Sequence, residues 1–216
     1  MKLRNKKQEQ IMEKNTKIKI CGLTRPEEAI YLNEEKVDYA GMVLFFEKSK
    51  RNITIKQAEQ IMKELDPVIK KVAVVVKPTL KQVQDIEGAG FDLIQIHGEV
   101  FEEILKETTI PIWKAFNVSD MQDFETYQTM ERVVGYVFDA AKPGSGETFD
   151  WKLMDQIPRD DKLLMLAGGL NQENVAEAIC YLHPDGVDVS SSVERTDRQE
   201  KDQRKVKDFV KAVRSV

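Results

Sequence analysis

From Lys17 to its end, the chain alternates between short apolar runs and longer charged stretches. The runs are rich in β-branched and other apolar side chains, as in buried strands of a parallel sheet. The stretches between them have apolar positions at helical spacing, which is typical of helices that cover such a sheet. The predicted strands are residues 17–21, 39–45, 72–76, 93–97, 112–116, 134–139, 163–167 and 187–190.

The predicted helices begin near residues 26, 54, 79, 99, 120, 150, 171 and 202. Thr24 precedes Pro26 and an acid of the first turn, the order expected of a capped helix start. Eight β-then-α units in one chain of this length predict a single (β/α)8 TIM barrel of the α/β class. The alternative is an open doubly wound sheet. That fold would more often have five or six strands and a glycine-rich first turn, which residues 21–24 lack.

Composition narrows the class of protein further. Residues 1–16 are polar and lack an apolar face, so we expect a flexible N-terminal extension followed by one catalytic barrel domain at 17–216. The net charge is −4, whereas nucleic-acid or membrane-surface binding usually needs a basic face. Two cysteines cannot form a disulfide framework and fit a reducing compartment. We therefore expect a cytoplasmic protein that binds neither nucleic acid nor a membrane.

In a TIM barrel the active site lies at the carboxyl ends of the strands. Polar residues and glycines stand at five of the predicted strand ends, and loops follow two strands at 48–51 and 142–146. The candidates at the strand ends are Cys21, His97, Asp139, Gly168, Gly169, Ser190 and Ser191. We expect one face of the barrel to bring them together.

Alternation along the first strand gives Cys21 a charged neighbour. Lys19 and Cys21 share one face of this strand, while Ile18 and Ile20 share the other. The isoleucines suit the layer beneath the helices, so Lys19 is predicted to point into the barrel and to lower the thiol pKa. The first and last strands are neighbours in a closed barrel. We therefore predict that Asp188 is the partner of Lys19.

The other candidates have simple chemical interpretations. Asp139, at the end of an apolar strand, is a candidate proton donor, and His97 a candidate for orienting a ligand. Backbone N–H groups near glycines 168 and 169 and serines 190 and 191 are suited to a phosphate. Gly144 and Gly146 predict a mobile cover. No metal-ligand spacing is present. We expect Cys180 to lie in a helix core, and residues 194–211 to form mostly a solvated helix face.

These residues resemble a known family. Residues 19–24 (KICGLT) are similar to the K-I-C-G-[IL]-T motif that opens the phosphoribosylanthranilate isomerases of tryptophan biosynthesis. The similarity spans about 17–216. It continues in order through residues 48–51, 95–98, 144–151, 166–171, 173–175 and 187–191.

The resemblance implies a TIM barrel that catalyses an Amadori rearrangement of N-(5-phosphoribosyl)anthranilate without a cofactor or a metal. By the same resemblance Cys21 is the general base and Asp139 the general acid, and Arg51 binds the anthranilate carboxylate. The substrate-binding residues would also include His97, Gly144, Gly146, Gly168, Gly169, Ser190 and Ser191. The partner is then a small phosphorylated substrate, and the chain a monomer or homodimer.

The chain departs from the family pattern at three places. Ser192 stands where the family usually has glycine, which would cost about 1 kcal/mol if that position needed a positive φ. The family's glycine before Lys201 is missing, and Pro143 stands where a glycine is common in the predicted cover.

Two alternative functions remain. One is a barrel that binds a sugar phosphate without turning it over. The other is the related histidine-pathway isomerase, which tends to carry Asp in place of Cys21.

Overall fold

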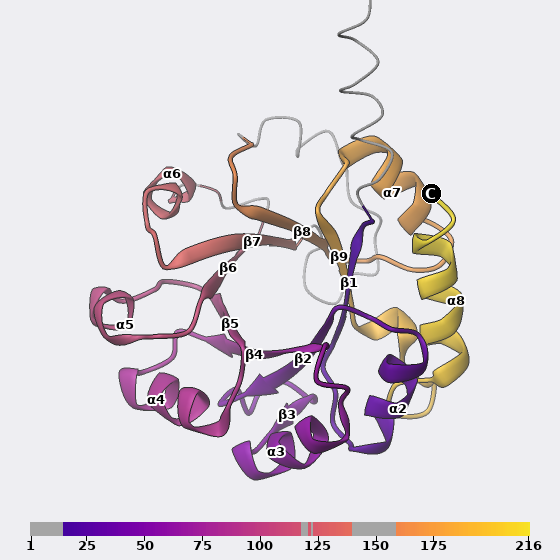
Figure 1. Cartoon of the computed structure of the whole chain (residues 1–216), viewed down its shortest axis with the longest axis horizontal. Coiled ribbons are helices and arrows are strands. Elements are labelled where there is room, and N and C mark those ends of the chain that lie inside the picture. Colours follow the sequence, from indigo (N-terminus) through magenta and orange to yellow (C-terminus); the bar gives the residue numbers. More distant parts are fainter. Residues whose placement is uncertain (1–14, 118–120, 122, 140–158) are drawn as a thin grey trace, which may run out of the picture.

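The strands of the barrel are all parallel, and the sheet closes on itself. The computed structural model of the protein describes residues 15–117, 121, 123–139 and 159–216. The strands follow the order β1-β9-β8-β7-β6-β5-β4-β2-β3, and β1 also pairs with β2, which closes the barrel (Figure 1). This architecture confirms the predicted TIM barrel and excludes an open doubly wound sheet.

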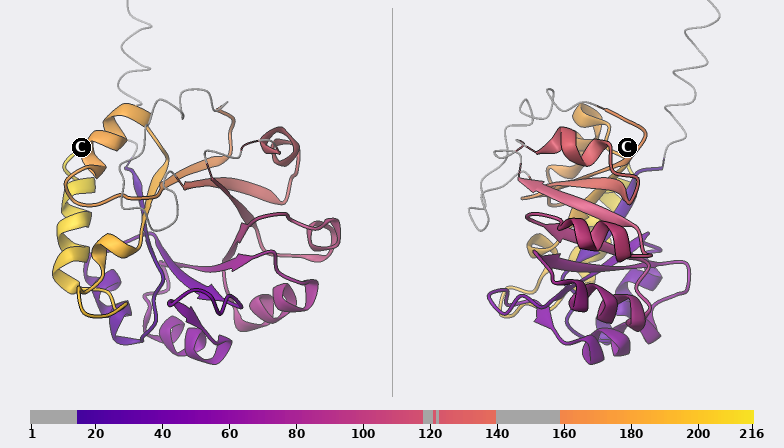
Figure 2. Two further views of the ribbon diagram at one scale, coloured as in Figure 1. Left: turned by 180° about the vertical axis from the view of Figure 1, so that it is seen from behind. Right: turned by 90° about the vertical axis from the view of Figure 1, so that its left-hand side faces the viewer.

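The strands are β1 (Lys17–Cys21), β2 (Tyr39–Leu44), β3 (Asn52–Ile53), β4 (Lys70–Val76), β5 (Leu93–His97), β6 (Ile112–Asn117), β7 (Val133–Asp139), β8 (Leu163–Ala167) and β9 (Gly186–Val189). The helices are α2 (Glu27–Glu34), α3 (Ile55–Glu64), α4 (Leu80–Ala89), α5 (Glu102–Glu107), α6 (Phe124–Gln128), α7 (Val175–Leu182), α8 (Gln203–Val213) and the short 3-10 helix η2 (Ser191–Val193). The helices ring the outside of the barrel when it is viewed along its axis, and the two views of Figure 2 show the same arrangement from behind and from the side. No helix among the described residues is long and apolar enough to cross a membrane.

Two apolar layers hold the barrel together. The outer layer lies between strands and helices and contains Ile18 and Ile20, both fully buried. The inner layer fills the barrel itself. Its members are Val72, Val74, Leu93, Trp113, Ala115, Val137, Met165 and Ala167, with Cys21 packed against them. The alternation predicted for β1 is therefore confirmed.

Local sequence explains several helix starts. Thr54 and Thr79 each form a capping box with the glutamine three residues later, as expected at the predicted starts near 54 and 79. Thr24 does not cap α2, because Pro26 is the N-cap and no side chain bonds to it as a cap. The carboxylate of Glu28 instead accepts the backbone N–H groups of Thr24 and Arg25.

Other boundaries differ from the prediction. The two-residue strand β3 was not predicted, and α5 and α7 begin three and four residues later than the predicted positions 99 and 171. The predicted starts near 120 and 150 lie outside the described residues, as does most of the predicted extension at 1–16, so the division into extension and barrel stays a prediction. Cys180 is exposed, and its prediction as helix core was wrong because it faces away from the strands while Ala178 and Ile179 are buried.

Candidate active site

The candidate residues meet in one cavity at the carboxyl ends of the strands. The cavity has a volume of about 320 Å³. The candidates in its lining are Cys21, Arg51, His97, Asp139, Gly168, Gly169, Ser190 and Ser191. Gly144 and Gly146 lie outside the described residues. Every candidate that the structure describes is thus brought to one place.

A larger cavity of about 630 Å³ lies elsewhere, beside β6 and α6. Its described lining includes Lys77, Glu99, Lys114 and Asp123, but not the thiol or the imidazole of the smaller cavity. Residues predicted to carry chemistry are absent from this lining, so the smaller cavity is the candidate active site.

Beneath Cys21, a buried ion pair joins the neighbouring strands β1 and β9. Lys19 Nζ lies 2.8 Å from Asp188 Oδ2, with the lysine side chain fully buried and the aspartate 8% exposed. The two residues are direct register partners in the parallel pairing of the strands, so the predicted Lys19–Asp188 pair is confirmed. Burial by itself lowers the pKa of Lys19, but attraction to Asp188 and Cys21 outweighs burial and raises it. Lys19 is therefore an ammonium at neutral pH.

Gly41 on β2 leaves room for the thiol and the ammonium. A Cβ at this position would lie 2.9 Å from Cys21 Sγ and 3.1 Å from Lys19 Nζ. Gly41 is the register partner of Cys21 on the neighbouring strand, so the thiol sulfur and the ammonium nitrogen both lie close to the position its Cβ would take. A side chain there would displace one of them.

The acidity of the Cys21 thiol differs from the prediction. Its removal from water raises the pKa of Cys21 above the ordinary value, and the lowering effects of Lys19 and Lys201 do not overcome this. The predicted influence of Lys19 therefore has the right direction, but the predicted net lowering was wrong. The thiol of Cys21 is therefore protonated at neutral pH.

His97 is a neutral side chain in this cavity. Burial, followed by the charges of Lys19 and Lys114, lowers the pKa of His97 to about 4. Its Nε2 lies 3.1 Å from the amide nitrogen of Gln95, which is buried on the same face of β5. His97 is consequently a hydrogen-bonding group rather than an acid at neutral pH.

The loops after β8 and β9 contribute glycines and serines to the lining of the cavity. Gly168 and Gly169 have φ angles of +87° and +67°, which glycine adopts without strain. Ser190 Oγ donates to the carbonyl oxygen of Cys21 at 2.9 Å and joins this loop to β1. Ser192 does not have a positive φ, and its hydroxyl donates to the carbonyl oxygen of Leu170 at 2.5 Å. The strain that a positive φ would impose on Ser192 is therefore not present.

Arg51, also in the lining of the cavity, is held by a buried carboxylate that the sequence did not reveal. Glu194 Oε1 lies 2.5 Å from Arg51 Nε, and Glu194 Oε2 lies 2.9 Å from Nη2. Lys201 Nζ lies 2.9 Å from Glu194 Oε1 and is fully buried. The interpretation of 194–211 as mostly a solvated helix face was thus wrong for these two residues, because the segment before α8 folds back against the barrel as an antiparallel bridge between them.

Metal ligation finds no support in the described part of the chain. It contains no group of three or more His, Cys, Asp or Glu side chains placed to hold a metal ion. The cavity instead combines a thiol, a carboxylate, a guanidinium and glycine-rich backbone, which suits proton transfer on an anionic ligand.

Comparisons with known proteins agree with this chemistry. The family described as N-(5'phosphoribosyl)anthranilate (PRA) isomerase matches residues 18–212. N-(5'-phosphoribosyl)anthranilate isomerase of Thermoanaerobacter pseudethanolicus is 38% identical over 206 residues, which cover 93% of this chain and 98% of the relative. The crystal structure of phosphoribosyl anthranilate isomerase from Thermotoga maritima has a TM-score of 0.80 at 34% identity, with 93% and 100% of the two chains covered. A structure of such an isomerase in complex with reduced 1-(o-carboxyphenylamino)-1-deoxyribulose 5-phosphate has a TM-score of 0.77 at 33% identity and the same coverage.

Proposed function

The chain belongs to the N-(5'-phosphoribosyl)anthranilate isomerase family, and on this premise we propose that Cys21 and Asp139 carry out the isomerisation as general base and general acid. The reaction is an Amadori rearrangement of N-(5'-phosphoribosyl)anthranilate to 1-(2-carboxyphenylamino)-1-deoxyribulose 5-phosphate, a step of tryptophan biosynthesis. The observation that carries the assignment is that a thiol and a carboxylate from strands on different sides of the barrel line one cavity of about 320 Å³.

The reaction needs an acid and a base in turn. Asp139 gives a proton to the ribose ring oxygen, the C1–O bond breaks, and the nitrogen lone pair forms the C1=N bond of a Schiff base. The Cys21 thiolate then takes the C2 proton. The electrons of that C–H bond form the C1=C2 bond of an enolamine, and the electrons of the C1=N π bond return to nitrogen. Tautomerisation to the ketone returns a proton to C1 and completes the isomerisation with no net change in atoms or electrons. Two groups in opposite protonation states are therefore required at one pH.

The surroundings of Cys21 support its role as base. Lys19 and Lys201 both favour the thiolate, although burial keeps the pKa of Cys21 above its ordinary value. A base of raised pKa is a strong proton acceptor once it is ionised. Gly41 leaves the space in which the thiol and the ammonium meet.

Two groups of lining residues suit the two anionic groups of the substrate. Backbone N–H groups around Gly168, Gly169, Ser190 and Ser191 are proposed to bind the phosphate, and the glycines let the backbone approach it closely. Arg51 is proposed to bind the anthranilate carboxylate, because a planar guanidinium matches a carboxylate with two parallel donors. His97, neutral and fixed by its neighbour, is proposed to orient the ligand by a hydrogen bond.

The two glycines of the predicted cover, 144 and 146, stay predictions as substrate-binding residues. We also propose that the protein works in the cytoplasm as a monomer or homodimer on a small phosphorylated substrate. Size-exclusion chromatography with light scattering measures the oligomeric state directly.

The test is a fluorescence assay that follows the loss of phosphoribosylanthranilate in wild type, Cys21→Ala and Asp139→Asn. We expect kcat to fall at least a hundredfold in each variant, since general acid–base groups typically contribute about 10²–10⁴-fold. Cys180→Ala is the matched control, because it removes the same thiol from an exposed position on α7 and should leave kcat unchanged.

The outcomes separate the proposals. Turnover by wild type with an unimpaired Cys21→Ala variant would contradict the base assignment while leaving the activity intact. A folded wild type that binds the reduced product without turnover would favour the alternative of a barrel that binds a sugar phosphate without acting on it.

A further inference from the structure

A fully buried lysine stands behind the guanidinium proposed to bind the substrate carboxylate. Lys201 Nζ lies 2.9 Å from Glu194 Oε1 and 3.2 Å from the carbonyl oxygen of Ser190. Glu194 is 7% exposed and Arg51 is 27% exposed, so exposure rises from the lysine through the glutamate to the arginine. The three side chains form a row that runs from the interior to the cavity, and we call them the Arg51–Glu194–Lys201 row.

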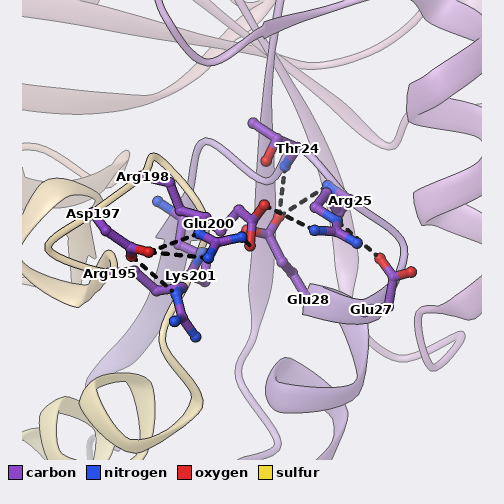
Figure 3. Close-up of polar contacts among 9 residues, drawn as sticks. All are labelled: Thr24, Arg25, Glu27, Glu28, Arg195, Asp197, Arg198, Glu200 and Lys201. Carbon is purple, nitrogen blue, oxygen red and sulfur yellow. Dashed lines mark hydrogen bonds and ion pairs between the residues drawn. The ribbon is translucent and has the colours of Figure 1, made fainter.

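The backbone fixes the inner end of this row. Figure 3 shows Glu28 of α2 at the centre of contacts with the loop after β1 and with Lys201. One carboxylate oxygen accepts the backbone N–H of Lys201 at 2.5 Å, and the other accepts that of Thr24 at 2.6 Å. Nearby, Arg25 Nη1 donates to Glu200 Oε1 at 2.8 Å across the same two segments. The lysine therefore cannot swing away without breaking backbone contacts.

The geometry of Arg51 leaves donors for a ligand. A guanidinium has five N–H donors, and Glu194 takes one on Nε and one on Nη2. The two N–H groups of Nη1 and the second of Nη2 remain, and they form the other edge of the planar group. The stem of Arg51 crosses Gly22, where a Cβ would lie 2.5 Å from Arg51 Cδ. The guanidinium is thus held from one edge, and its other edge can accept a second carboxylate.

Lys201 adds a positive charge to the row. Arg51 and Glu194 alone form a neutral pair, and a neutral pair attracts an incoming carboxylate weakly. Burial lowers the pKa of Lys201, and attraction to Glu194 opposes this effect. As an ammonium, Lys201 compensates the charge of Glu194 from the inner side, so the row as a whole carries one positive charge. Burial by itself raises the pKa of Glu194, but its bonds to Arg51 and Lys201 outweigh burial and keep it ionised.

We propose that Lys201 is a positioning and specificity-determining residue, which through Glu194 keeps the charge and the free edge of Arg51 available for the carboxylate of the substrate. This inference rests on the proposed function in that it takes the carboxylate to be that of the anthranilate ring. Lys201 itself does not touch the ligand.

The experiment is a double-mutant cycle of Lys201→Met and Glu194→Gln, read as the equilibrium affinity for two ligands. Reduced 1-(2-carboxyphenylamino)-1-deoxyribulose 5-phosphate carries the carboxylate, and ribose 5-phosphate carries only the phosphate. We expect Lys201→Met to weaken binding of the carboxylated ligand at least tenfold and to change that of ribose 5-phosphate less than twofold. Lys207→Met, the same substitution at an exposed position of α8, should change neither affinity.

The double variant distinguishes a loss of affinity caused by charge from one caused by a structural defect. In the double variant the row contains only the charge of Arg51, so its net charge equals that of wild type. We expect the double variant to bind the carboxylated ligand at least threefold more tightly than Lys201→Met does. A double variant as weak as Lys201→Met, or equal losses for the two ligands, would overturn the proposal, because a structural lesion worsens with a second substitution and does not select between ligands.

If Lys201→Met does not fold, comparison of Glu194→Gln with the double variant tests the same proposal. Glu194→Gln leaves two positive charges, whereas the double variant leaves one, so Glu194→Gln must bind the carboxylated ligand more tightly. Equal affinities of these two variants would overturn the proposal. Failure of the proposed function is recognised separately, as absence of turnover by wild type.

Discussion

Replacement of Lys19 by methionine isolates the cost of an unpaired charge inside the barrel. Its side chain is fully buried, and its partner Asp188 is 8% exposed at 2.8 Å. Removal of one partner of such a pair costs about 3–5 kcal/mol, because the other charge stays buried without compensation. Methionine fills a similar volume, so the cavity contribution is small. For a chain of this size the melting temperature should fall by about 6 to 20 °C.

The same strand contains a matched control. Lys17 Nζ lies 2.7 Å from Asp38 Oδ1, almost the same distance, but the two side chains are 49% and 26% exposed. Exposed pairs contribute only about 0–1 kcal/mol, because water screens the attraction. Lys17→Met should therefore cost less than about 1 kcal/mol, although it removes the same charge from the same strand.

Urea unfolding followed by far-UV circular dichroism measures both free energies of unfolding at pH 7. The double variant Lys19→Met/Asp188→Asn should be more stable than Lys19→Met, because the carboxylate is gone. Burial already raises the pKa of Asp188 in wild type, and loss of the lysine raises it further. The native variant then binds a proton more tightly than the unfolded chain. Its deficit should therefore shrink as pH falls through the raised native pKa towards the ordinary carboxyl value of about 3.9.

Two results would refute this reasoning. One is a loss for Lys19→Met within 1 kcal/mol of that for Lys17→Met, which would mean that burial does not separate the two pairs. The other is a deficit that grows as the solution is acidified, which would mean that Asp188 is not the group left unpaired.

Three further variants test the rest of the site. Cys21→Asp should retain part of the activity. Its kcat/KM should decline on the acid side at a pH several units lower than in wild type, since burial holds the thiol pKa above its ordinary value. An unchanged pH dependence would contradict the base assignment. Gly41→Ala should lower kcat/KM at least tenfold and the stability by about 1–3 kcal/mol, because its Cβ would lie 2.9 Å from Cys21 Sγ; wild-type kinetics would show that the thiol needs no such room. Glu28→Gln should cost about 1–3 kcal/mol in urea unfolding, because its amide nitrogen cannot accept a backbone N–H from Thr24 or Lys201; an unchanged midpoint would count against this role of the carboxylate.

Elements with a regular period were predictable from the sequence. The alternation on β1 and closure of the barrel together placed Lys19 opposite Asp188, because β1 and β9 pair in a register that the apolar faces determine. The candidate residues also shared one cavity, because a parallel barrel brings all carboxyl ends of its strands to the same side. Periodicity and topology were sufficient for both.

Contacts between irregular segments were not predictable in this way. Glu28 has the sequence context of an ordinary acid in a first turn, and only the return of the chain near residue 201 brings a third backbone N–H to it. Glu194 and Lys201 lie in a segment of high charge, where burial depends on a fold-back that has no period. Cys180 was misassigned for the opposite reason, since apolar neighbours at 178 and 179 suggested a core position although the thiol points outward.

The buried charges around Cys21 set its strength as a base. Lys19 and Lys201 favour the thiolate, but each also faces an acid, which offsets part of this effect. Burial therefore dominates, and the pKa of Cys21 stays raised. A thiolate with a raised pKa is a strong proton acceptor. The same burial that disfavours the thiolate thus favours removal of the C2 proton once Cys21 is ionised.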